Sequence, residues 1–298
     1  MIRIKEENAW LRRFQASVGV DVVISDNRWG LYLEGVESVF ITHQLKIRTP
    51  FGLLADGLVQ RMNYVAIRRF SRCWIPDEAD GRFSLAGDLS HPSKKPTIPL
   101  RYIGCLSRFG VPAPLSASAN DAALSSAFDL LVLLSGPEPQ RTLLERTILE
   151  QSAATGIRIV LVRGLPGGGS PDLVFPSNVK VFAHLPAESL EPLIRSAGLV
   201  LARSGYSTIM DLMRLGKKAI LIPTPGQTEQ EYLGSYLAGK GLAFCIDQRR
   251  FALAGALAMV RDQRLGPSGQ QSPEGVRPME GGGLAAAVQE VLAAVTGR

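Results

Sequence analysis

One short stretch of the sequence gathers a glycine and three hydroxyl side chains at a single predicted strand-to-helix junction. Residues 201–216 read LARSGYSTIMDLMRLG, and they place Ser204, Gly205, Ser207 and Thr208 between an apolar strand-like run and a helix. Such a junction can cap the helix, carry a serine nucleophile or bind an anion. A cap through Ser204 or Ser207 is expected in any case, but a cap requires only one hydroxyl.

The pattern argues against a nucleophile and favours an anion. A nucleophile turn follows G-x-S-x-G, and Ile209 stands where the second glycine belongs. No histidine follows the junction, because His184 is the last one in the chain. A glycine and several hydroxyls at a helix start suit a phosphate or diphosphate. Asp211 lies one turn after Ser207, where a carboxylate can accept hydrogen bonds from a ribose diol.

Two further strand-to-helix loops carry polar residues of the same kind. SGPEPQR (135–141) begins with Ser135 and Gly136, which let backbone N–H groups approach a ligand closely. PTPGQTEQEY (223–232) opens a helix with Gln230 and Glu231, whose amide and carboxylate suit a polyol. Each loop alone also fits an ordinary turn or a capped helix start. Together, at one edge of a parallel sheet, they predict a nucleotide-sugar site.

The elements that must position these loops alternate between apolar strands and helices. Strands are predicted at 21–25, 36–42, 72–76, 98–104, 128–135, 157–164, 179–185, 198–202, 217–223 and 241–247. Helices are predicted at 4–18, 56–70, 138–154, 187–197, from 206, at 227–239 and at 283–295. This order is typical of parallel sheets covered on both faces. We predict two Rossmann-like α/β domains, 1–110 and 127–298, joined by a Pro/Ser/Ala-rich linker at 111–126.

Composition excludes several classes of protein. The chain has 298 residues, of which 46% are hydrophobic and 20% charged, and its formal net charge is +6. The three cysteines and three histidines are scattered, so neither a disulfide framework nor a metal cluster is expected. The charged N-terminus does not resemble a signal peptide, which indicates a cytoplasmic protein. The basic excess favours an anionic substrate or a membrane surface over nucleic acid.

The second half resembles the donor-binding region of GT-B glycosyltransferases of the MurG-like family 28. That family's pattern is S-R-x-G-x-S-T-x-x-E-L, then G-x-P-x-I-x-I-P and a glutamine-bearing helix; here the matching residues span roughly 127–248. The resemblance implies a GT-B fold of two Rossmann-like domains and a transferase that uses a UDP-type sugar donor, without a cofactor or a metal. It implies that donor-binding residues occupy these positions: Ser135, Gly136, Arg203, Ser204, Gly205, Ser207, Thr208, Asp211, Gln230 and Glu231.

This sequence departs from the family pattern at several points. Asp211 stands where the family has Glu, and Glu231 stands where it usually has Gln. The first half is the weaker match, and the family's opening strand and Gly-rich loop have no counterpart before residue 21. We therefore expect the first domain to be abbreviated. Candidates for the base that takes the acceptor's proton are Asp26 and His43, although either can be an ordinary turn or strand-end residue.

The sequence leaves three functions open. The first is an inverting glycosyltransferase that moves an N-acetylhexosamine or hexose to an acceptor hydroxyl. The second is a UDP-sugar 2-epimerase, for which Glu229 and Glu231 would act near the sugar carbon. The third is a non-catalytic nucleotide-sugar-binding protein. The acceptor is not identified; basic and apolar residues near 57–75 raise the hypothesis of a lipid-linked acceptor and a peripheral membrane contact.

Overall fold

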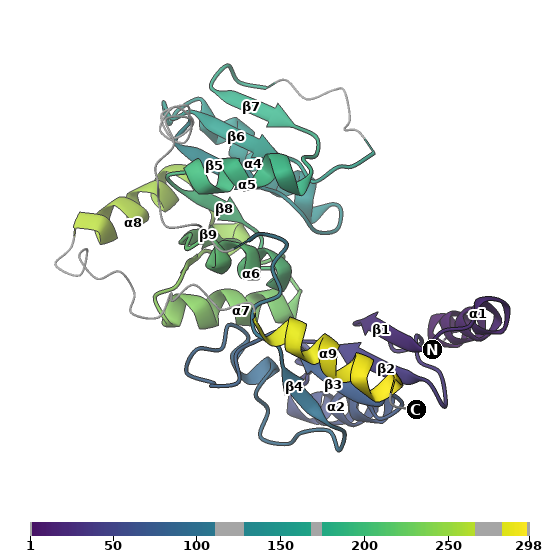
Figure 1. Cartoon of the computed structure of the whole chain (residues 1–298). Coiled ribbons are helices and arrows are strands. Elements are labelled where there is room, and N and C mark those ends of the chain that lie inside the picture. The colour runs from purple at the N-terminus through teal and green to yellow at the C-terminus, as the bar shows by residue number, and fades with distance from the viewer. Residues whose placement is uncertain (1, 111–127, 168–174, 266–281, 297–298) are drawn as a thin grey trace. The chain divides into compact units, whose positions relative to one another are not determined.

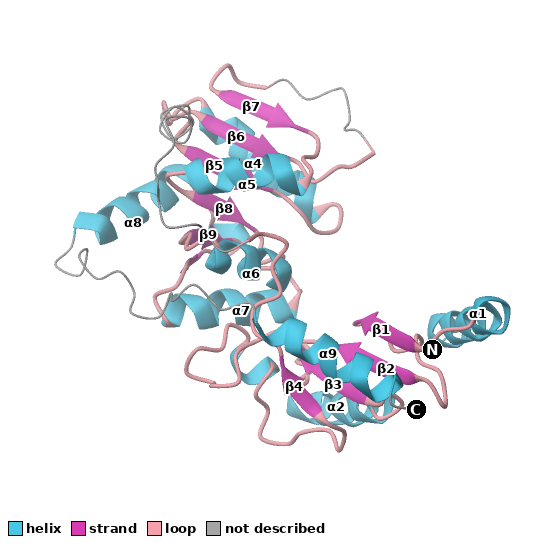
Figure 2. Ribbon diagram, viewed as in Figure 1, coloured by secondary structure: helices cyan, strands magenta, loops and turns pink. Residues whose placement is uncertain are grey.

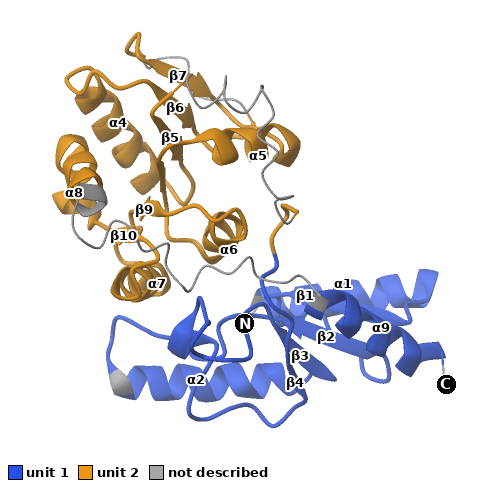
Figure 3. Ribbon diagram, turned by 60° about the vertical axis from the view of Figure 1, so that its left-hand side comes forward, with its two compact units in different colours: residues 1–106, 280–298 blue, residues 107–279 orange. Residues whose placement is uncertain are grey.

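The chain folds into two compact units, each with its own sheet (Figure 3). The computed structural model describes residues 2–110, 128–167, 175–265 and 282–296. Unit 1 comprises residues 1–106 and 280–298, and unit 2 comprises residues 107–279. The predicted linker at 111–126 lies outside the described residues, as does the N-terminal Met1.

Unit 1 contains a parallel sheet of four strands in the order β1-β2-β3-β4 (Figure 2). The strands are β1 (Val22–Asp26), β2 (Glu37–Ile41), β3 (Arg72–Ile75) and β4 (Leu100–Tyr102). Successive side chains alternate between the two faces of a strand. Phe40 and Cys73 therefore pack with Ile67 of helix α2 (Leu53–Ile67), while Val39 and Trp74 face the other side. A short 3₁₀ turn, η1 (Gly87–Leu89), lies between β3 and β4.

Two helices from opposite ends of the sequence complete unit 1 (Figure 1). Leu11 of helix α1 (Ile2–Val18) packs with Val23 of β1. Helix α9 (Gly282–Thr296) packs Ala287 and Val291 against Val39 and Trp74. The sequence analysis grouped α9 with the second domain. A single amphipathic helix carries no signal for which sheet it covers, so its partner could not be found from its pattern.

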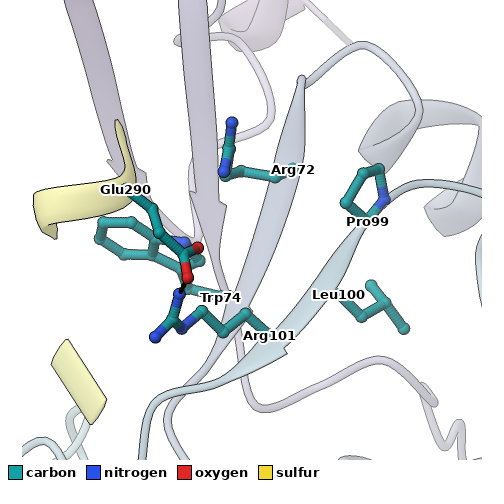
Figure 4. A pocket seen from close by; sticks show the side chains of 6 residues that line it. All are labelled: Arg72, Trp74, Pro99, Leu100, Arg101 and Glu290. Atoms are coloured by element: carbon teal, nitrogen blue, oxygen red, sulfur yellow. Dashed lines mark ion pairs between the residues drawn. The ribbon is translucent and has the colours of Figure 1, made fainter. Parts of the chain in front are cut away.

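Contacts at the start and in the middle of α9 hold it on this sheet. A β-carbon added at Gly283 would lie 2.5 Å from the carbonyl oxygen of Ile103, so only glycine fits there. In the middle of the helix, Glu290 forms an ion pair with Arg101 beside the ring of Trp74 (Figure 4). The close backbone approach and the ion pair fix the register of α9 along the sheet.

Unit 2 contains a parallel sheet of six strands in the order β10-β9-β8-β5-β6-β7. The strands are β5 (Leu130–Leu133), β6 (Ile159–Val162), β7 (Val179–Phe182), β8 (Val200–Ala202), β9 (Ala219–Leu221) and β10 (Phe244–Cys245). The strand order reverses between β5 and β8. In open α/β sheets this reversal opens a crevice at the carboxyl ends of the strands, where ligands bind.

Helices cover both faces of the second sheet (Figure 3). They are α4 (Gln140–Ser152), α5 (Ala187–Ser196), α6 (Tyr206–Arg214), α7 (Thr228–Gly239) and α8 (Leu253–Leu265), with a 3₁₀ turn η2 at Gln248–Arg250. Figure 3 shows α4 and α8 on one side and α5 and α6 on the other. The sequence analysis missed α8, because its apolar residues show little helical periodicity. The predicted pair of parallel, Rossmann-like sheets is confirmed.

Candidate functional site

The three loops selected from the sequence lie side by side at one edge of the second sheet. They follow β5, β8 and β9, and these strands are direct neighbours in the order β9-β8-β5. All three strands are parallel, so all three loops leave the same edge. The loops after β5 and β8 flank the point where the strand order reverses. This is the position at which a parallel sheet presents helix N-termini to an anionic ligand.

The loop after β5 is exposed above a buried cluster of charges. Ser135 is exposed, and Gly136 has a φ of +97°, a conformation that favours glycine. Below them, the fully buried carboxylate of Glu145 binds two buried guanidiniums, at 3.1 Å from Arg141 Nη1 and 3.1 Å from Arg163 Nη2. Arg141 also pairs with Glu138 of the same loop at 2.6 Å, so two carboxylates balance the two guanidiniums and the cluster fixes the loop on α4.

Arg203 is buried at the centre of this edge, and its guanidinium links several loops through hydrogen bonds. Its exposed fraction is 1%, and its guanidinium donates to the carbonyl oxygen of Gln140 at 2.7 Å and to Gln248 Oε1 at 2.6 Å. A further bond of 3.2 Å reaches the carbonyl oxygen of Ile222. Burial lowers the pKa of Arg203 to about 10. Arg203 therefore joins α4, β9 and η2, and its predicted contact with the donor stays a prediction.

The helix start after β8 differs from the expected cap. Gly205 occupies the N-cap position of α6. Ser204 is fully buried, and its Oγ donates to the carbonyl oxygen of Gln230 at 2.8 Å, so it joins two loops and does not cap the helix. Ser207 is exposed and Thr208 half-buried in the first turn. The prediction of a cap through Ser204 was wrong, because a partner distant in sequence takes its hydrogen bond.

Asp211 is engaged by a segment that the sequence analysis did not consider. Its Oδ1 accepts hydrogen bonds from Ser107 Oγ at 2.7 Å and from the backbone N–H of Arg108 at 3.3 Å. Its Oδ2 accepts from Arg108 Nε at 2.9 Å. Asp211 is 5% exposed, whereas half of the Arg108 side chain is exposed. Asp211 therefore holds an arginine in a fixed orientation, and its predicted contact with ribose stays a prediction.

A cavity of about 150 Å³ lies at the same edge of unit 2. Its polar lining comes from four loops or helix starts, and the apolar lining includes Leu185 and Leu212. The polar residues are Arg108, Ser135, His184, Thr208 and Asp211. Arg108 and His184 were not among the predicted donor-binding residues, which all follow β5, β8 or β9, whereas Arg108 precedes the linker and His184 follows β7.

The loop after β9 is organised by its own polar side chains. Gln230 Oε1 accepts from the backbone N–H of Thr224 at 3.0 Å, and its Nε2 donates to Gln227 Oε1 at 2.6 Å. Glu231, which is exposed, accepts from the backbone N–H of Gly226 at 2.9 Å. These bonds fix the loop beside the helix start of α7. The contacts predicted between these two side chains and sugar hydroxyls stay predictions.

The two candidate bases lie at the carboxyl edge of the first sheet. Asp26 ends β1 and pairs in register with Ile41 of β2, and His43 follows two residues later. Asp26 is exposed and His43 is half-buried. Asn27, with a φ of +53°, turns the chain away by donating its N–H to the carbonyl oxygen of Ile41 at 2.9 Å. The strand register thus brings the two predicted residues to one edge.

Another cavity, of about 290 Å³, lies at the amino ends of β3 and β4, under α9 (Figure 4). Its arginines are both paired, Arg72 with Glu37 at 2.5 Å and Arg101 with Glu290. The charges at this cavity therefore cancel. Within the described residues, no group of three or more His, Cys, Asp or Glu side chains could hold a metal ion.

Comparison with known proteins identifies the second unit. Residues 174–270 match the family model of the glycosyltransferase family 28 C-terminal domain. This segment of unit 2 is therefore similar to the C-terminal domains of glycosyltransferase family 28. The family 28 domain includes the loops after β8 and β9, and the resemblance inferred from the RSGYST motif is confirmed.

Two relatives of part of the chain have the same name. A 77-residue segment is 38% identical to the UDP-N-acetylglucosamine--N-acetylmuramyl-(pentapeptide) pyrophosphoryl-undecaprenol N-acetylglucosamine transferase of Acidiphilium cryptum (strain JF-5), covering 25% of this chain and 21% of that protein. The transferase of the same name from Desulforudis audaxviator (strain MP104C) is 38% identical over 87 residues, covering 28% of this chain and 23% of the relative. The matches thus span under a quarter of either relative.

The fold comparison extends to both units. The glycotransferase of kitacinnamycin superposes with a TM-score of 0.63 at 18% sequence identity, covering 97% of this chain and 81% of that one. At this identity the likeness concerns the fold. The chain has the GT-B architecture of two parallel α/β units, as predicted from the sequence.

Proposed function

We propose that this chain transfers a sugar from a nucleoside diphosphate donor, of the UDP type, to an acceptor hydroxyl. The observation that carries the proposal is the cavity where Arg108, Ser135, Thr208 and Asp211 come together at the strand-order reversal. A cation, hydroxyls and helix starts in one place are the groups that a leaving diphosphate requires. The family 28 match of the same unit supports this choice of ligand.

The proposed reaction is a single displacement with inversion. The acceptor oxygen attacks the anomeric carbon, the bond from that carbon to the diphosphate oxygen breaks, and a base takes the acceptor's proton. The N-termini of α4 and α6 and the guanidinium of Arg108 offset the charge that develops on the diphosphate, so the proposal needs no metal. Asp211 holds Arg108 through Nε and leaves its other nitrogens for phosphate oxygens.

The proposal also specifies the class of donor sugar and the class of acceptor. The relatives' name specifies UDP-N-acetylglucosamine as donor and an undecaprenol-linked acceptor. We propose an N-acetylhexosamine or hexose as the transferred sugar and a lipid-linked acceptor met at the cytoplasmic membrane surface. In the part of the chain that the structure describes, no helix is long and apolar enough to cross a membrane. Asp26 and His43 are the proposed candidates for the base.

The donor site is tested by calorimetry with UDP on two glycine variants. Gly136 and Gly156 both have positive φ values, +97° and +66°, so an alanine strains the backbone at either position. Gly136 lies in the loop after β5, whereas Gly156 follows α4 at the opposite edge. Gly136→Ala should weaken UDP binding at least tenfold, and Gly156→Ala should leave it unchanged. A wild-type chain that binds no nucleoside diphosphate would overturn the proposal.

A sugar epimerase is the second candidate, favoured by the exposed carboxylate of Glu231 beside the loop after β9. An epimerase converts its nucleotide sugar without an acceptor, whereas a transferase does not. Incubation of UDP-N-acetylglucosamine with the chain alone distinguishes the two by NMR of the sugar product. Appearance of the C2 epimer would replace the transferase proposal; unchanged donor would support it.

A further inference from the structure

The cavity at the amino ends of β3 and β4 is built on one face of the first sheet (Figure 4). Side chains two positions apart on a strand share a face, so Arg72 and Trp74 of β3 lie on the same side. Arg101 of β4 is in register with Trp74 and therefore projects to that side as well. Helix α9 covers this face and adds Glu290. The fold thus gathers two guanidiniums, an indole and a carboxylate around one space of about 290 Å³.

The two ion pairs at this cavity differ in how firmly they are held. The side chain of Glu37 is 6% exposed, so its buried carboxylate requires Arg72, whose Nε lies 2.5 Å from Glu37 Oε1. The side chain of Glu290 is 58% exposed, and an ion pair with an exposed partner contributes little to stability. Glu290 can therefore leave Arg101 with little loss of stability, whereas Glu37 cannot leave Arg72. Arg101 is the guanidinium that a ligand can bind.

Trp74 adds a buried hydrogen-bond donor that lacks an acceptor. The residue is 1% exposed, and its Nε1 has no hydrogen-bond partner among the described residues. A buried N–H without an acceptor is unfavourable and uncommon in folded proteins. Because Nε1 is itself covered, an acceptor reaches it only when a neighbouring side chain moves. Figure 4 shows Glu290, paired with Arg101, beside the indole ring, and Glu290 is the neighbour that can move.

We infer that this cavity binds a small carboxylate that also carries an ammonium group, which is the chemistry of an amino acid. The ligand's carboxylate replaces Glu290 on Arg101 and accepts the N–H of Trp74, and the released Glu290 pairs with the ammonium. The two ion pairs of the empty cavity balance in charge, and a ligand without net charge keeps that balance. The inference does not rest on the proposed function, because the residues that line this cavity include none of the predicted donor or base residues.

The test is NMR of the full chain, in which the indole N–H signal of Trp74 is followed. The chain has three tryptophans, and the variant Trp74→Phe assigns the signal. L-Alanine and propionate share a carbon skeleton, and only alanine carries an ammonium. Alanine should move the Trp74 signal downfield as the N–H gains an acceptor, with a dissociation constant of about 1 mM for so small a ligand. Propionate should bind about tenfold more weakly, because it leaves Glu290 without a partner.

Substitutions at the exposed ion pair separate the two ends of the ligand. Glu290→Gln should weaken alanine binding about tenfold, because the ammonium loses its partner, and should tighten propionate binding, because Arg101 is no longer paired. Arg101→Gln should abolish the binding of both ligands. Glu191→Gln and Arg195→Gln are the matched controls, since they alter a glutamate–arginine pair of α5 in unit 2. Both controls should bind alanine as the wild type does.

The opposite effects expected of Glu290→Gln on the two ligands cannot come from a damaged fold, which would weaken both. A Trp74 signal that neither alanine nor propionate moves would overturn the inference. Propionate that binds as tightly as alanine to the wild type would overturn the inferred class of ligand. These outcomes leave the proposed function unaffected, because UDP calorimetry measures binding of a different ligand.

Discussion

The pair formed by Arg108 and Asp211 is the most informative contact at the scale of single residues. The resemblance implied that Asp211 takes ribose hydroxyls, yet both of its oxygens accept hydrogen bonds from Ser107 and Arg108. An aspartate is one methylene shorter than the glutamate of the family pattern. The shorter side chain keeps the carboxylate close to α6. There the carboxylate binds Arg108, which lines the cavity.

Arg108→Gln tests whether this arginine binds phosphate. We expect UDP affinity to fall by about 10- to 100-fold, since a hydrogen bond to a charged group is worth about 1.5–3 kcal/mol. Uridine, which has no phosphate, should bind as before. Calorimetry with both ligands separates a lost charge from a damaged fold, which would weaken both.

Arg158→Gln is the matched control, because Arg158 is also a half-exposed arginine of unit 2 paired with an aspartate, Asp129. It should leave both affinities unchanged. If the two variants behave alike toward UDP, Arg108 does not contact the diphosphate.

A sequence motif can indicate local chemistry but not contacts between distant segments. Glycine, serine and threonine after β5 and β8 lie at one edge of the sheet, as their places after two apolar strands predict. The partner of Asp211 lies more than 100 positions earlier, and Ser204 bonds to Gln230 in the next loop. Contacts between segments distant in sequence depend on the folded sheet, so no local pattern contains them.

At the scale of elements, close packing of α7 positions the loop after β9. A β-carbon at Gly234 would lie 2.7 Å from Cys245 Sγ and 3.1 Å from Pro223 Cγ. Gly239, in the same helix, has open space around the same position. These two glycines therefore offer a paired test of how tightly α7 is held against β10.

Gly234→Ala should lower the free energy of unfolding by about 1–3 kcal/mol through overpacking. It should also weaken binding of a UDP-sugar more than binding of UDP, since the loop carries the predicted sugar contacts. Gly239→Ala should raise stability by up to about 1 kcal/mol, because alanine favours the helix. Urea denaturation measures the free energy of unfolding. A Gly234→Ala variant that is more stable than the wild type would contradict the predicted overpacking.

Elements with strong apolar runs were predicted well, and those defined by packing were not. Every strand of both sheets overlaps a run identified from the sequence, since a parallel strand is buried on both faces. Helix α8 was missed because Leu253 and Ala256 contact the core without a clear amphipathic repeat. The sheet covered by α9 was not predicted, because Ala287 and Val291 fit any apolar surface.

At the scale of the whole molecule, the two units have separate cores and should unfold as separate transitions. Val291 is 2% exposed in the core under α9, and its neighbour Leu292 is 47% exposed. Val291→Asp should destabilise unit 1 by about 3 kcal/mol or more, because it buries an unpaired charge. Leu292→Asp should have little effect.

Scanning calorimetry with and without UDP tests whether the two units unfold in separate transitions. Ligand at 100 times its dissociation constant should stabilise the binding unit by about 2.7 kcal/mol. In the Val291→Asp variant, UDP should still raise the unfolding temperature of unit 2. The unfolding temperature of unit 1 should be lower than in the wild type. A single transition that shifts as a whole would show that the two cores are coupled.

The docking of α9 also has a consequence for the order of synthesis. The residues of unit 2 lie between the strands of unit 1 and α9, so the sheet of unit 2 can close before α9 is synthesised. During that interval Trp74 and Val39 lack their covering residues, Ala287 and Val291. Unit 1 should therefore be completed after unit 2, and a ribosome that stalls before α9 would leave a folded unit 2 and an open apolar sheet in unit 1 for a chaperone to shield.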